Sequence, residues 1–175
     1  AYIWSEGPTP PHALALANVA CEDGKLTDEG KLYDVRGWAD VDANGDFIGL
    51  PDGGDTTQAS LLIYDATSQS WSSGPAPELG QSASTCGIVD GKLMVAGGFF
   101  DNTEDPDAIW ITSTTSVYDL ETESWSEGGP LPQYIFNGRG VVYTGQLCAF
   151  GGEGNEGLLD AWFCYSDGVW IQQLD

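Results

Sequence analysis

The sequence predicts an all-β fold made of repeated four-stranded antiparallel units, and three observations predict it. A Trp-Ser stretch that runs into Gly and Pro begins at three positions, Trp4, Trp71 and Trp125. A second stretch of the form Gly-(Lys/Gln)-Leu begins at Gly30, Gly91 and Gly145, and the last two copies are 54 residues apart, as are Trp71 and Trp125. No segment shows the apolar period of an amphipathic helix. Landmarks that recur in a fixed order indicate an internal repeat, so one structural unit is expected to occur several times.

The elements of one unit can be followed in order through the middle copy. The segment 82–89 alternates loosely, Asp90-Gly91 is typical of a hairpin turn, and 92–96 is the second strand. A long polar loop leads to the β-branched segment 111–120, and a short turn then leads to the strand that opens at Trp125. The sequence therefore predicts three units at 10–77, 78–132 and 133–175, preceded by a spare Trp strand at 1–9.

These landmarks resemble the kelch repeats of β-propellers, and the resemblance covers nearly the whole chain. The matching residues are the pairs Gly97-Gly98 and Gly151-Gly152, the pairs Tyr64-Asp65 and Tyr118-Asp119, and the Trp six residues after each Asp. The first unit departs from the pattern with Arg36-Gly37-Trp38 in place of the Gly pair, and the third has Tyr165-Ser166 in place of Tyr-Asp. The resemblance implies a propeller whose blades are these units.

Three blades do not complete a propeller, since closed rings have 4–8 blades. We therefore expect an incomplete ring with exposed edges, which closes or extends by self-association into a homo-oligomer or polymer. A piece of a longer propeller is the alternative. The residues expected at the assembly edges are Tyr2, Ile3 and Trp4 at one end and Val169, Trp170 and Ile171 at the other.

The charge of the chain limits its partners. There are 27 acidic residues against 5 basic ones, a formal net charge of -22. This field repels nucleic acid phosphates and anionic membrane surfaces, and no apolar run approaches the roughly 18 residues that a membrane-spanning helix needs. The charge favours cations, basic partners or a saline habitat, and predicts neither nucleic acid binding nor membrane insertion.

The stretch DVDANGD in the first unit has the oxygen spacing of a calcium loop. The candidate ligands are Asp40, Asp42, Asn44 and Asp46, with Asp52 further on. Position 12 of such a loop, where a bidentate Glu usually binds, is Pro51. Two interpretations are open: a solvated acidic turn, or a single site for calcium, which is the one cofactor that the sequence suggests.

All three loops between second and third strands are acidic, and blade symmetry predicts that they share one face. The candidate polar residues of this binding face are Asp101, Glu104, Asp105, Asp107, Glu153, Asn155 and Glu156. The flanking aromatic residues are Trp38, Trp110 and Trp162. These rings could stack on a glycan, and packing within or between blades is the alternative.

The four cysteines allow two disulfides. A hairpin centred near Glu156 sets Phe150 opposite Trp162 and Cys148 opposite Cys164, where a bond can form if the pair is of the close kind. Cys21 and Cys86 lie on the first strands of successive units. The pairs Cys21–Cys86 and Cys148–Cys164 are consistent with an extracellular or secreted protein, and four buried thiols are the alternative.

Nothing in the sequence marks a catalytic site. The chain has one histidine, His12, and two arginines, Arg36 and Arg139. The galactose-oxidase relatives of kelch propellers, by resemblance, use two histidines at a copper site. We therefore expect a non-enzymatic interaction or self-assembly module with a protein or glycan ligand. A calcium- or carbohydrate-binding propeller module and a non-catalytic fragment of a larger propeller enzyme are the alternatives.

Overall fold

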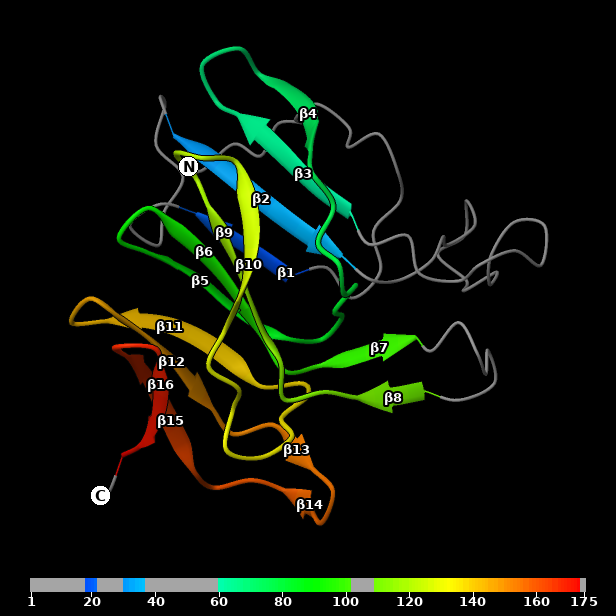
Figure 1. Cartoon of the computed structure of the whole chain (residues 1–175), viewed down its shortest axis with the longest axis vertical. Helices are drawn as coiled ribbons and strands as arrows, with labels where there is room; N and C mark the ends of the chain where they lie inside the picture. Colours follow the sequence, from blue (N-terminus) through cyan, green and yellow to red (C-terminus); the bar gives the residue numbers. More distant parts are fainter. Residues whose placement is uncertain (1–17, 22–29, 37–59, 102–108, 174–175) are drawn as a thin grey trace, which may run out of the picture.

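The structure is a computed structural model that describes residues 18–21, 30–36, 60–101 and 109–173. These residues form three four-stranded antiparallel sheets and two small hairpins, and the described part of the chain contains no helix (Figure 1). The all-β prediction and the four-stranded antiparallel units are confirmed. The three sheets do not close a ring.

The order of strands within each sheet follows the order along the chain. The first sheet contains β1 (Asn18–Cys21), β2 (Lys31–Arg36), β3 (Ser60–Asp65) and β4 (Ser70–Gly74). The second contains β5 (Thr85–Val89), β6 (Lys92–Ala96), β9 (Thr115–Asp119) and β10 (Ser124–Gly128). The third contains β11 (Arg139–Tyr143), β12 (Gln146–Phe150), β15 (Trp162–Ser166) and β16 (Val169–Gln172). The hairpins β7 (Phe99–Asp101) with β8 (Ile109–Ile111) and β13 (Glu153–Gly154) with β14 (Gly157–Leu158) connect second and third strands.

The first strands of successive sheets lie next to one another. Strand β5 contacts both β1 and β11, so the second sheet lies between the other two (Figure 1). One hydrophobic cluster fills the space between the first and second sheets and includes Tyr33, Leu61 and Tyr118. Another fills the space between the second and third and includes Leu147 and Trp170. The core of the molecule is therefore made of sheet-to-sheet interfaces.

The repeated Trp has a packing role in these interfaces. In each sheet the Trp ring contacts the Tyr ring opposite it on the neighbouring strand, with centroids 5.0–5.3 Å apart. The pairs are Tyr64–Trp71, Tyr118–Trp125 and Tyr165–Trp170. Such pairs stabilise a fold beyond the area they bury, which explains why Tyr and Trp recur opposite each other.

The Gly-Gly pairs are required by both backbone conformation and space. Gly98 has φ +89°, and a Cβ there would lie 2.3 Å from the carbonyl oxygen of Ser82. Gly152 has φ +87°, and its Cβ would lie 2.6 Å from the carbonyl oxygen of Phe136. Any side chain at these positions is excluded by a close backbone contact as well as by the positive φ.

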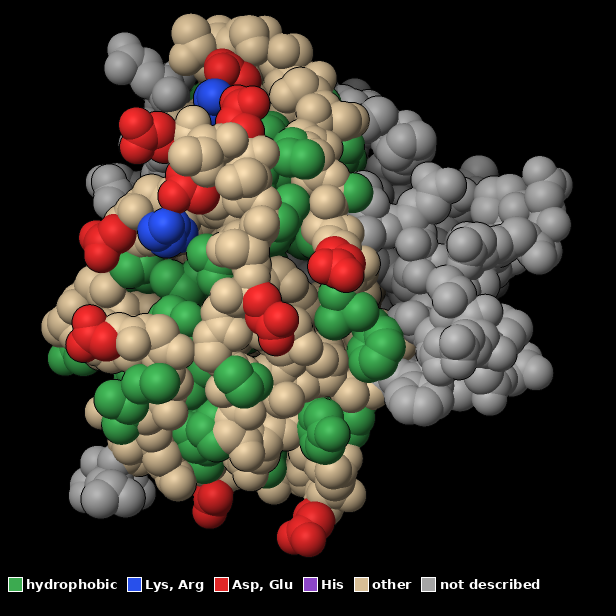
Figure 2. All heavy atoms as spheres, viewed as in Figure 1, with side chains coloured by type: hydrophobic (Ala, Val, Ile, Leu, Met, Phe, Trp, Pro, Cys, Tyr) green, Lys and Arg blue, Asp and Glu red, His purple; other side chains and the backbone are tan. Residues whose placement is uncertain are grey.

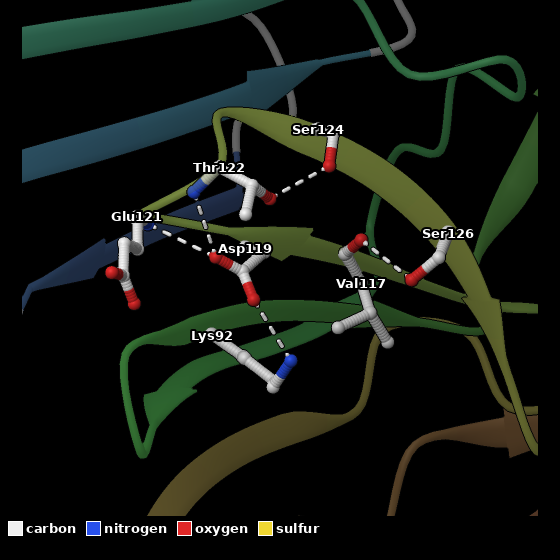
Figure 3. Close-up of polar contacts among 7 residues, drawn as sticks. All are labelled: Lys92, Val117, Asp119, Glu121, Thr122, Ser124 and Ser126. Atoms are coloured by element: carbon white, nitrogen blue, oxygen red, sulfur yellow. Dashed lines mark hydrogen bonds and ion pairs between the residues drawn. The ribbon is translucent and has the colours of Figure 1, made fainter.

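The repeated spacing from Asp to Trp is explained by a turn that the Asp carboxylate holds in place (Figure 3). Asp119 accepts hydrogen bonds from the backbone N–H groups of Glu121 and Thr122, at 3.0 and 2.9 Å, and from Lys92 Nζ at 3.0 Å. Asp65 accepts the N–H of Ser68 at 2.9 Å in the equivalent turn. In the third sheet Ser166 replaces the Asp, and a shorter turn through Asp167 and Gly168 joins the strands.

These hydrogen bonds predict a pH dependence of stability. The pKa of Asp119 is lowered from 3.8 to about 2. The largest cause is the hydrogen bond from the backbone N–H of Thr122, and the second is the hydrogen bond from the Lys92 side chain. Since the folded pKa lies below the unfolded one, the stabilisation is fully present above about pH 4 and is lost as the pH falls through about 2. We expect Asp119→Asn to be less stable than the wild type at neutral pH, with a gap that narrows between about pH 4 and 2. Thermal unfolding of both proteins across this range measures the gap, and a gap independent of pH would contradict the assignment.

Candidate interaction surfaces

The hairpins β7–β8 and β13–β14 extend from the same end of the second and third sheets (Figure 1). Backbone hydrogen bonds in both directions hold each hairpin to the segment that precedes its sheet, between Ser82 and Phe99 and between Phe136 and Glu153. The ring of Phe99, in β7, lies 4.6 Å between centroids from the ring of Phe136, whose backbone is hydrogen-bonded to Glu153 in β13. We call the described residues of these hairpins, together with Tyr134, the hairpin face.

The hairpin face combines apolar and acidic groups. The side chain of Leu158 is 87% exposed and that of Tyr134 is 40% exposed. Asn155 and Glu156 are exposed in the turn of β13–β14, and Glu153 is half-buried. Acidic side chains are scattered over the visible surface, where basic ones are few (Figure 2). This surface can offer apolar contacts surrounded by carboxylates. The sequence does not single out Leu158 or Tyr134, because a single exposed apolar residue has no sequence signature.

Several predicted site residues lie outside the described residues. They are the five candidate calcium ligands Asp40, Asp42, Asn44, Asp46 and Asp52, together with Trp38, Glu104, Asp105 and Asp107, and the edge residues Tyr2, Ile3 and Trp4. Asp101 and Trp110 are described only by their backbone positions, in β7 and β8. In the part of the chain that the structure describes, no three His, Cys, Asp or Glu side chains group so as to hold a metal ion. The calcium site stays a prediction.

The predicted register of the third sheet is confirmed. Cys148 lies opposite Cys164 and Phe150 opposite Trp162, and the two cysteines form a disulfide between β12 and β15. Cys21 and Cys86 lie on β1 and β5, which contact each other, but the side chain of Cys21 is outside the described set. The pair Cys21–Cys86 therefore stays a prediction.

The two tryptophans of the third sheet both pack against neighbouring side chains. Trp162 lies opposite Phe150, as predicted, and stacks on it, with centroids 5.0 Å apart and planes at 14°. Trp170 is only 6% exposed, and its Nε1 donates to Thr115 Oγ1 at 2.9 Å. Its side chain packs against the second sheet, whereas its backbone lies in β16, the last strand of the third sheet, so its place at an assembly edge stays a prediction. Of the predicted C-terminal edge residues, Val169 and Ile171 are exposed, at 53% and 50%.

The face of the third sheet that points away from the second sheet is apolar and open. Val141 is 45% exposed, Tyr143 59% and Phe150 37%, and Ile171 lies in the same row as Val141 and the disulfide. We call this surface the outer face of the third sheet. In Figure 2 hydrophobic side chains are exposed over the part of the molecule where this sheet and its hairpin lie. An apolar surface of this kind indicates an interaction site.

A cavity of about 440 Å³ lies beside the outer strand of the second sheet. Pro77, Leu79 and Trp125 line it with apolar surface, and Glu78 and Glu127 add carboxylates. The Nε1 of Trp125 donates to the carbonyl oxygen of Pro75 at 2.7 Å, so this donor is already used within the chain. Nothing in this arrangement marks a reaction.

No helix among the described residues is long and apolar enough to span a membrane.

Comparison with known proteins agrees with the architecture. The kelch motif model matches residues 80–132, which include the whole second sheet. An F-box/kelch-repeat protein of Arabidopsis thaliana is 32% identical over 124 residues, which cover 70% of this chain and 27% of that protein. Human Kelch-like protein 34 is 28% identical over 116 residues, 63% of this chain and 17% of that protein. The solved structure of YjhT matches with a TM-score of 0.67 and 19% identity, over 97% of this chain and 48% of that one. The chain thus spans about half of the YjhT chain and about a quarter of the Arabidopsis relative.

Proposed function

Because this chain belongs to the kelch-repeat family, we propose that it is a non-enzymatic protein-interaction module that binds its partner through the hairpin face. The observation that carries this proposal is the exposure of Leu158, at 87%, on a hairpin whose backbone is hydrogen-bonded to the segment before its sheet. Because the backbone of this hairpin is already fixed, no conformational entropy is lost in ordering it when a partner covers Leu158. Tyr134 adds an aromatic surface nearby, and such residues are enriched where binding energy concentrates.

The charge of the chain indicates the chemistry of the partner. With a net charge of -22, the chain attracts basic proteins from a distance and repels acidic ones. Glu153 and Glu156 place carboxylates beside Leu158 on the same hairpin. The best partner is therefore a segment with one or more large apolar residues flanked by Lys or Arg.

We also infer that the chain self-associates through its open third sheet and that it works outside the cell. Support for the first comes from the apolar outer face of that sheet. Support for the second comes from the Cys148–Cys164 disulfide, because such bonds persist in oxidising compartments.

A displayed library of random peptides tests the hairpin face and does not require the natural partner to be identified first. We expect selection on the wild-type chain to enrich peptides that contain large apolar residues together with Lys or Arg. These peptides should bind Leu158→Ser at least about tenfold more weakly than the wild type, a loss of about 1.4 kcal/mol of binding free energy. Their binding to the wild type should also weaken as the salt concentration rises. The matched control is Ile171→Ser, a change at another exposed apolar residue on a different surface. Peptides that bind Leu158→Ser as well as the wild type would overturn the proposal.

A further inference from the structure

The cavity of about 440 Å³ beside β10 lies next to the linker that joins the first sheet to the second. Residues 77–79 of this linker form one wall. The second sheet forms the other, where Trp125 and Glu127 lie on the same face of β10 and Ser116 lies opposite Glu127 on β9. Its volume is within the range of roughly 300–1,000 Å³ that ligand pockets have. Because β10 is the edge strand of its sheet, a partner can reach the cavity from outside the molecule.

Two hydrogen-bond donors that line the cavity are already used inside the chain. Trp125 Nε1 donates to the carbonyl oxygen of Pro75 at 2.7 Å, and Ser116 Oγ donates to Gln81 Oε1 at 2.6 Å. The indole has no other polar atom, so Trp125 can offer a ligand only its ring surface. Ser116 can still offer the lone pairs of its oxygen. Both residues therefore suit a ligand that brings its own donors.

The two carboxylates of the cavity are available to a ligand. Glu78 on the linker and Glu127 on β10 are both exposed, and neither side chain has a hydrogen bond or ion pair in the described part of the chain. No Lys, Arg or His is among the described residues that line the cavity. The walls thus combine acceptor oxygens on two sides with aromatic surface. Their complement is a cation with several N–H donors, no acceptor and a flat face.

This combination is particular to one of the two sheet-to-sheet interfaces. Counted from the Tyr–Trp pair of each sheet, the residue of the third sheet equivalent to Ser116 is Phe163, and the one equivalent to Glu127 is Gln172. Phe163 is 3% exposed and belongs to the core cluster between the second and third sheets. A large ring and a neutral amide therefore replace the small hydroxyl and the carboxylate. The acidic cavity is not a necessary feature of the repeat.

We propose that this cavity binds an arginine side chain of a protein partner. A guanidinium group has five N–H donors and no acceptor, and it can stack on an aromatic ring while its edge bonds to a carboxylate. A lysine ammonium has the charge but not the flat surface, so arginine fits the Trp125 wall better. The net charge of -22 attracts a basic partner to the chain from a distance. The site is separate from the hairpin face and does not depend on it.

Titration of the isotopically labelled chain with the capped tripeptide acetyl-Gly-Arg-Gly-amide, followed by nuclear magnetic resonance, tests the proposal. We expect saturable shifts of the Trp125 indole N–H and the Leu79 backbone N–H, and none at Leu158. The citrulline tripeptide, which has nearly the same shape and no charge, should bind at least about tenfold more weakly. The lysine tripeptide and free L-arginine, whose own carboxylate the cavity repels, should also bind more weakly. Equal binding of any of these three probes, or no saturable shift with the arginine tripeptide, would overturn the proposal.

Charge-removing variants distinguish the cavity from the overall charge of the chain. Glu78→Gln and Glu127→Gln should each raise the dissociation constant of the arginine tripeptide about threefold, and the double variant at least about tenfold. Glu121→Gln is the matched control, since it removes the same charge from an exposed residue that does not line the cavity. A double variant that binds like the wild type, or an equal loss in Glu121→Gln, would contradict the assignment. Leu158→Ser should leave this binding unchanged, so failure of the cavity site would not be confused with failure of the hairpin face.

Discussion

Replacing both Cys148 and Cys164 with alanine should lower the free energy of unfolding by about 3 kcal/mol. The two cysteines are 16 residues apart, so the disulfide closes a loop that includes the whole β13–β14 hairpin. Without the bond, the unfolded chain regains the conformational freedom of this loop. Both side chains are almost fully buried, at 0% and 4% exposed, and their replacement also removes apolar contacts in the middle of the third sheet.

Urea denaturation followed by circular dichroism measures this effect, with and without reducing agent. The reduced wild type should approach the stability of the double variant. Reducing agent added to the double variant provides a second test, because any further loss of stability would indicate a bond between Cys21 and Cys86. A double variant that unfolds at the same urea concentration as the oxidised wild type would contradict the expected role of the disulfide.

The disulfide occupies the place of a hydrophobic pair in the second sheet. The equivalents of Cys148 and Cys164 there are Met94 and Val117, which the third sheet covers. No further sheet covers the third sheet among the described residues, yet its two cysteines are no more exposed than that pair, at 0% and 4% against 6% and 9%. The covalent bond between β12 and β15 thus joins the two middle strands at a position that is buried without a further sheet on it.

The sequence is informative where a local physical requirement fixes a residue type. The Asp in Tyr-Asp is needed because its carboxylate accepts the N–H groups of its own turn. The Gly pair is needed because a backbone carbonyl occupies the space of a side chain. The register of β12 and β15 can be predicted because the turn at Asn155 and Glu156 fixes which residues face each other. Each of these requirements acts within one unit and is visible in a short stretch.

Contacts between units are less predictable. The strands of the third sheet are apolar on both faces, and periodicity cannot tell which face another sheet covers. For this reason the open outer face of the third sheet is visible only in the structure. Gln81 is a further example: it is 1% exposed, donates to the carbonyl oxygens of Gly97 and Thr114, and accepts from Ser116 Oγ. The equivalent residue in the third unit is Ile135, so a polar and an apolar side chain occupy the same buried position.

Trp170→Ala should cost about 4 kcal/mol of unfolding free energy, the second large effect that we expect. The indole is 6% exposed and fills the space between the second and third sheets, and its Nε1 is the hydrogen-bond donor to the fully buried Thr115 Oγ1. Alanine would leave a cavity at the interface and an unsatisfied hydroxyl beside it.

Comparison with the equivalent tryptophan separates this packing effect from a general loss of aromatic surface. Trp125 is half-buried, and its Nε1 donates to a backbone carbonyl, that of Pro75. We therefore expect Trp125→Ala to cost only about half as much unfolding free energy, because less of its area is removed from water.

Trp170→Phe keeps most of the volume of the side chain but loses the hydrogen-bond donor, and should lower the free energy of unfolding by about 1–2 kcal/mol. Urea denaturation monitored by circular dichroism, which does not depend on the replaced indoles, measures all three variants. Equal losses for Trp170→Ala and Trp125→Ala would show that the interface between the second and third sheets contributes no more than the one between the first and second.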